Sequence, residues 1–132
     1  MVLLERKHIT IILNKEKEFL CQKWKGFVPA TEFRRAIDFS MDTLDACGFY
    51  RIISDITEQK VVSPREQEYV RDEVINFLEK NKRFRLAFIV KDNSVIETCA
   101  RLYDRMLKEK NLEGVNRFFA SPAEAEEWLL SQ

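Results

Sequence analysis

The end of this chain places a short apolar strand directly before a helix start, and the same unit occurs twice earlier. Each unit combines an apolar run of strand length, a residue that caps helices well, and a segment with helical periodicity. The strands of the three units are residues 49–55, 84–90 and 115–119, and the helix starts are Ser63, Asn93 or Ser94, and Ser121. Serial strand–helix units predict an α/β protein, with parallel strands joined by crossover helices.

The first part of the chain predicts a hairpin followed by a helix. Residues 8–14 largely alternate between apolar and polar side chains, and a charged turn separates them from a second strand at 19–24. The link is too short for a crossover, so these strands are antiparallel. Helical periodicity then runs from Pro29 to Gly48. The predicted order ββαβαβαβα gives a single domain over residues 1–132, with a mixed five-stranded sheet and an antiparallel N-terminal hairpin at its edge.

The apolar faces of the helices predict which side chains are buried. The predicted buried face of the third helix comprises Val95, Ile96, Cys99, Leu102, Tyr103 and Met106. Phe39 lies outside the apolar face of the first helix, and Ile12 breaks the alternation of the first strand. Exposed apolar side chains of this kind favour an interface with a partner or a second copy. Single exposed apolar residues are also common on protein surfaces and then have no function.

Four segments carry a resemblance to a known superfamily. They are residues 24–27, 52–55, 85–90 and 118–129, with the sequences WKGF, IISD, RLAFIV and FFASPAEAEEWL. Together they resemble the SpoIIAA-like (STAS-like) superfamily of small bacterial proteins over nearly the whole chain. The resemblance implies a β–α superhelix with strands in sequential order and helices mostly on one face of the sheet. Some relatives in this resemblance are grouped with lipid-binding domains.

Polar residues near the carboxyl ends of the predicted strands form a candidate anion or phosphorylation site. Helix N-termini at this edge of a sheet favour anions. Phosphorylatable members of the superfamily carry serine in an Asp-Ser-Ser-Gly-like turn after the third strand, where this chain has DITE at 55–58. The candidate residues are Asp55, Thr57, Ser63, Asn93 and Ser94. The alternative is that the serines and Asn93 cap their own helices and Thr57 is a turn residue.

Composition excludes several functional classes. Lys and Arg together number 22, as do Asp and Glu, so the chain has no net positive charge for nucleic acid. His8 is the only histidine, and three glycines cannot build a phosphate-binding loop, so we expect no metal, no cofactor and no catalytic residues. No apolar run reaches the length of a membrane span. Three scattered cysteines and a charged N-terminal region predict a cytoplasmic protein.

Two functional hypotheses follow. The first is a non-enzymatic regulatory or protein-interaction module that binds a protein partner or forms a homodimer, with Trp24, Phe27 and Phe39 as candidate contacts. The second is a carrier of a small hydrophobic or lipid-like ligand, in which Trp24, Phe27 and Phe119 line a pocket. A carrier should contain an apolar pocket of a few hundred Å3, whereas an enzyme should bring titratable groups together in a cleft.

Overall fold

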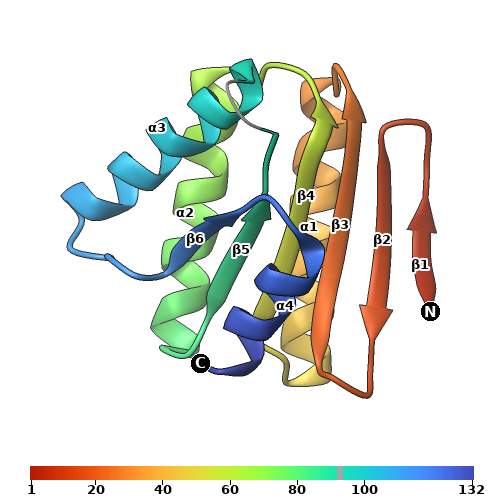
Figure 1. Cartoon of the computed structure of the whole chain (residues 1–132), viewed down its shortest axis with the longest axis vertical. Helices are drawn as coiled ribbons and strands as arrows, with labels where there is room; N and C mark the ends of the chain where they lie inside the picture. The colour runs from red at the N-terminus through yellow and green to blue at the C-terminus, as the bar shows by residue number, and fades with distance from the viewer. Residues whose placement is uncertain (92–93) are drawn as a thin grey trace.

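The chain folds around one twisted sheet that the helices cover unequally (Figure 1). A computed structural model describes residues 1–91 and 94–132. In these residues six strands lie side by side in sequence order. The strands are β1 (Val2–Glu5), β2 (Ile9–Asn14), β3 (Phe19–Gly26), β4 (Arg51–Gln59), β5 (Arg85–Ile89) and β6 (Asn116–Phe119). The helices are α1 (Ala30–Cys47), α2 (Pro64–Lys80), α3 (Val95–Glu109) and α4 (Pro122–Leu130).

The pairing of the strands confirms the predicted mixed sheet and adds one strand. The pairs β1–β2 and β2–β3 are antiparallel, whereas β3 to β6 are parallel. Residues 2–5 form the edge strand, so the prediction that the 8–14 strand lies at the edge was wrong. Hydrogen bonds from Arg6 N to Ile9 O (2.8 Å) and from Leu13 N to Met1 O (2.8 Å) hold this short strand against β2.

β4 is longer than its sequence predicts, and its pairing with β3 is irregular. Lys23 pairs with Asp55, but Lys25 pairs with Glu58, so β4 contains one extra residue between these pairs. Such a β-bulge reverses which side chains of the strand face each side of the sheet. The strand therefore continues to Gln59, and residues 55–58 are not the loop that was predicted from the sequence.

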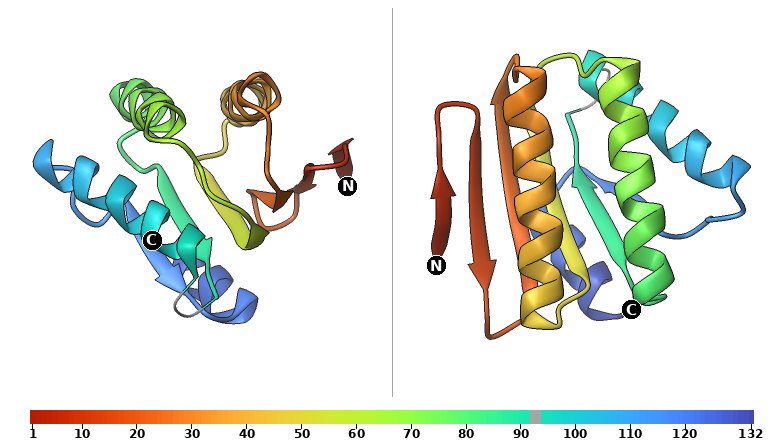
Figure 2. Two further views of the ribbon diagram at one scale, coloured as in Figure 1. Left: turned by 90° about the horizontal axis from the view of Figure 1, so that it is seen from above. Right: turned by 180° about the vertical axis from the view of Figure 1, so that it is seen from behind.

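The two faces of the sheet carry cores of different size. The larger core joins the sheet to α1, α2 and α3, and the smaller one places Ala125 and Leu129 of α4 on the opposite face. Figure 2 shows α1 and α2 on one side of the sheet and α4 on the other. The expectation that helices lie mostly on one face is confirmed.

Local chemistry sets the helix starts as predicted. Ser63, Ser94 and Ser121 each accept a hydrogen bond from the backbone N–H three residues later, at the first turns of α2, α3 and α4. The predicted face of α3 was partly wrong, because Val95 and Leu102 are exposed. The buried residues of α3 are Ile96, Ala100, Tyr103 and Leu107.

Candidate functional site

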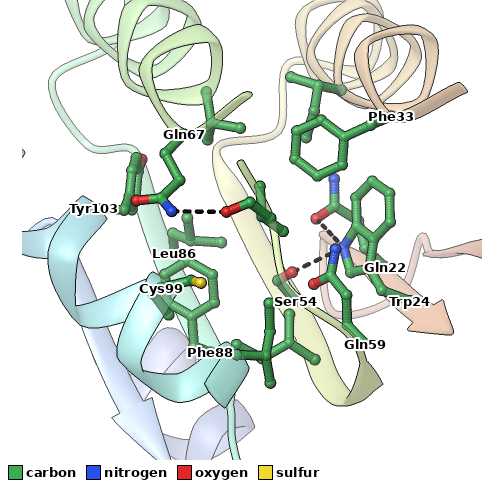
Figure 3. A pocket seen from close by; sticks show the side chains of 16 residues that line it. Gln22, Trp24, Phe33, Ser54, Gln59, Gln67, Leu86, Phe88, Cys99 and Tyr103 are labelled. Carbon is green, nitrogen blue, oxygen red and sulfur yellow. Dashed lines mark hydrogen bonds between the residues drawn. The ribbon is translucent and has the colours of Figure 1, made fainter. Parts of the chain in front are cut away.

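A partly open hollow lies between the sheet and three helices, and we call it the inner hollow (Figure 3). Its volume is about 70 Å3, which is smaller than the few hundred Å3 expected of a carrier pocket, and its lining is almost entirely apolar. Strands β3, β4 and β5 form its floor, and α1, α2 and α3 contribute the other walls. Its apolar walls include Phe33, Ile56, Leu86, Phe88 and Ala100. An apolar space of this kind accepts an apolar guest more readily than water.

The few polar groups on the floor of the inner hollow are mostly bonded to one another. The indole Nε1 of Trp24 donates to Ser54 Oγ (3.1 Å) and to Gln22 Oε1 (3.3 Å). Gln22 Nε2 donates to Ser40 Oγ at 2.8 Å, and Ser40 Oγ donates to Ala36 O at 2.8 Å. A fully bonded buried network holds its side chains in one arrangement. This network therefore fixes the Trp24 ring, which lines the hollow.

Gln59 is the exception among the buried glutamines. The residue is 6% exposed, and no hydrogen-bond partner for Nε2 lies among the described residues. Gln67, which lines the same hollow, instead donates from Nε2 to Val62 O at 3.0 Å. The β-bulge explains the placement, because without the extra residue Gln59 would share the opposite face with Asp55. The strand thus directs a buried, unpaired donor to the hollow.

A second hollow, the outer hollow, adjoins the first at the N-termini of α1 and α2. Its volume is about 270 Å3. Phe33, Gln59 and Val62 line both hollows and so lie at their junction. The remaining lining residues are Val28, Ala30, Val61, Ser63 and Glu66. The outer hollow is at the carboxyl ends of β3 and β4, where ligands bind in open α/β sheets.

The charge in the outer hollow is already paired. Ser63 Oγ donates to Glu66 Oε2, and Arg34 contacts Glu66 Oε1 through Nε and Nη2, both at 2.9 Å. The hydrogen bond from Ser63, aided by Arg34, holds the pKa of Glu66 below its ordinary value despite burial. Glu66 is therefore an anion near neutral pH, and both of its oxygens are occupied.

The residues predicted from the sequence fall into separate places. Trp24 lines the inner hollow and Ser63 the outer one. Phe27 is 70% exposed and follows Gly26, whose carbonyl accepts a hydrogen bond from Lys60 N at 3.0 Å. That bond places the segment after β3 beside the segment after β4, which brings Phe27 close to the edge of the outer hollow. Phe39 is exposed on α1 and lines neither hollow.

The predicted anion site is not one cluster. Asp55 and Thr57 belong to β4, and Asp55 Oδ1 accepts hydrogen bonds from Thr57 N (3.1 Å) and Thr57 Oγ1 (2.7 Å). Thr57 is therefore a strand residue and not the predicted turn residue. Ser94 caps α3, and Asn93 lies outside the described residues. Phosphorylation of any of these residues stays a prediction.

Phe119 does not line the hollow that the carrier hypothesis requires. It packs on the α4 face against Trp128, with ring centroids 5.7 Å apart, which corrects the sequence-based placement. Sequence reasoning also missed Gln22, Gln59 and Gln67. Of these three, only Gln22 could have been found from the sequence. It lies two residues before Trp24 in the same strand, and alternate strand residues face the same side of the sheet.

Comparison with known proteins is informative about the fold. No family model matches the chain, and no curated protein matches it. Among solved structures, the chain is similar to the crystal structure of an uncharacterized protein from the DUF3478 family with a SpoIIAA-like fold, from Shewanella loihica PV-4. The two are 19% identical with a TM-score of 0.55, and the match covers 96% of this chain and 98% of that chain. The chain has a SpoIIAA-like fold.

Residues 1–91 and 94–132 contain no group of three or more His, Cys, Asp or Glu side chains arranged to hold a metal ion. None of the described helices is long and apolar enough to cross a membrane.

Proposed function

We propose that this SpoIIAA-like protein is a non-enzymatic binding protein that holds a small, largely apolar molecule in the inner hollow. The observation that carries the proposal is an apolar interior space with an unpaired buried amide at its junction with the outer hollow. Protein interiors are close-packed, so an unfilled space lowers the free energy of unfolding. A ligand that enters through the outer hollow would fill this space.

The distribution of titratable groups supports binding over catalysis. Tyr69, whose pKa burial raises to about 12, and Glu73, whose pKa burial also raises, lie on α2 outside both hollows. Glu66 is the one carboxylate among the lining residues, and it is already bonded to Ser63 and Arg34. An acid–base pair needs two groups with separated pKa values facing one substrate. Tyr103 lines the inner hollow, and burial raises its pKa, but no carboxylate lines that hollow beside it. The lining residues therefore offer no such pair.

Native mass spectrometry of gently purified full-length protein tests this proposal. We expect a mass above that of the bare chain, and we expect the added mass to be lost in Ala100→Leu, which fills the inner hollow from α3. Ala125→Leu on α4 is a control that leaves both hollows unchanged. A bare chain mass for the wild type, before and after incubation with an extract of small apolar metabolites, would contradict the proposal.

A second candidate function is a protein interaction at the edge of the outer hollow. The observation that favours it is the exposure of Phe27 (70%) and Val61 (48%), whose segments the Lys60–Gly26 hydrogen bond holds together. Exposed apolar side chains that adjoin one another often mark an interface. Sedimentation velocity of wild type and Phe27→Ser tests the homodimer form: a wild-type dimer that the variant abolishes supports it, and a monomeric wild type refutes it.

A further inference from the structure

The chemistry of the ligand can be deduced from Gln59. A buried amide N–H without a partner is strongly destabilising, whereas an acceptor atom placed before it restores the hydrogen bond. Gln59 Nε2 is such a donor, and the β-bulge in β4 directs its side chain to the junction of the two hollows. Figure 3 shows the Gln59 amide among the side chains that line the inner hollow. The Tyr103 hydroxyl lines the same hollow and also has no hydrogen-bond partner among the described residues. An acceptor on a bound molecule would complete the hydrogen bonding of Gln59 Nε2.

The size of the inner hollow sets the length of the apolar part. One water-sized group needs roughly 10–15 Å3 of such space. The inner hollow, at about 70 Å3, therefore holds an apolar tail of roughly five to seven heavy atoms. The outer hollow, at about 270 Å3, has room for a larger group on the other side of Gln59.

The charge of the outer hollow determines the kind of acceptor. The Glu66 carboxylate lines this space, and its partners Ser63 and Arg34 are committed to it. A second carboxylate placed nearby would meet this anion in a partly buried setting, where like charges repel more strongly than in water. A neutral carbonyl accepts the same hydrogen bond from Gln59 without that repulsion.

We infer that the inner hollow binds a neutral carbonyl compound, a short aliphatic amide or ester, with its tail against Trp24 and Phe88 and its carbonyl oxygen on Gln59 Nε2. This inference rests on the proposed function and adds the ligand class to it. The larger group attached to the carbonyl lies in the outer hollow.

Three probes with different chemistry separate this inference from the proposed function. Xenon needs only an apolar space, hexanamide adds a neutral carbonyl, and hexanoate has the same chain length with a charged acceptor. Binding is measured on the full chain from 1H–15N amide shifts at neutral pH. We expect xenon to bind, and hexanamide to bind about tenfold more tightly than hexanoate, because the hexanoate carboxylate would face the Glu66 anion whereas both probes can accept the hydrogen bond from Gln59.

Two matched glutamine variants locate the acceptor. Gln59→Met keeps the length of the side chain and removes the donor, so we expect hexanamide affinity to fall about tenfold while xenon still binds. Gln67→Met changes a glutamine that lines the same hollow but is already bonded to Val62 O, and it should keep the preference for hexanamide over hexanoate. If Gln59→Met does not fold, Gln59→Leu replaces it.

The outcomes are distinguishable. Failure of xenon and both organic probes to shift amides near the inner hollow overturns the proposed function. Xenon binding with equal affinity for hexanamide and hexanoate, or with no loss in Gln59→Met, overturns the ligand class alone. An ordered water that stays on Gln59 Nε2 when hexanamide is bound would also overturn it.

Discussion

Filling the inner hollow should stabilise the protein. Ala100 is buried on α3 and lines this hollow. Cavity volume costs about 24 cal/mol per Å3, so the empty space of about 70 Å3 corresponds to a ceiling of about 1.7 kcal/mol. A leucine at this position fills part of the space, and we expect the free energy of unfolding to rise by about 1 kcal/mol.

The control for this substitution is Ala125→Leu. Ala125 is fully buried on α4, in the core on the other face, and lines neither hollow. The helix-propensity change is the same in both variants. Overpacking at Ala125 should lower the free energy of unfolding by about 1–3 kcal/mol. Urea denaturation measures both changes in the free energy of unfolding, provided that the m-value is unchanged. If Ala100→Leu is destabilised as much as the control, the inner hollow has no room for the added side chain, and the prediction is wrong.

Three further predictions concern the framework. Arg51→Ala removes the guanidinium that donates to the last turn of α4 at 3.1 Å, and should lower stability by about 0.5–1 kcal/mol with faster amide exchange in α4. Ser63→Ala should lower stability by about 1 kcal/mol near neutral pH. Because the hydrogen bond from Ser63 lowers the pKa of Glu66 from 4.5, that deficit should shrink as the pH falls below 4.5 in acid titrations of stability. Burial raises the pKa of Cys21 to about 11, so iodoacetamide should label exposed Cys47 before Cys21 at pH 8.

The parallel part of the fold was predictable because its signals are local. The Ser63–Glu66 segment combines a cap, a proline at the first helical position and a glutamate three residues after the cap. In the structure Glu66 N donates to Ser63 Oγ, and Ser63 Oγ donates to the Glu66 carboxylate. Apolar strands that are each followed by a helix N-terminus of this kind are sufficient to predict parallel strands joined by crossover helices. The strand at 2–5 was missed because four residues carry little periodic signal and their pairing depends on β2.

The candidate site was less predictable because it depends on tertiary contacts. Trp24 was expected to contact a ligand and does line the inner hollow. The sequence could not assign Gln59 to the hollow. A β-bulge shifts the two-residue period of β4, and no sequence pattern predicts where that bulge occurs. On α3, Val95 and Leu102 form an apolar stripe next to the buried one, and only packing decides which stripe is covered.

Xenon binding followed by 1H–15N amide shifts tests the central claim most directly, because xenon occupies apolar space without hydrogen bonds or charge. We predict saturable shifts at amides around Phe33, Gln59 and Ala100 in the wild type, and their loss in Ala100→Leu. Shifts that do not saturate, or that persist unchanged in Ala100→Leu, would show that the inner hollow binds no guest and would contradict the proposed function.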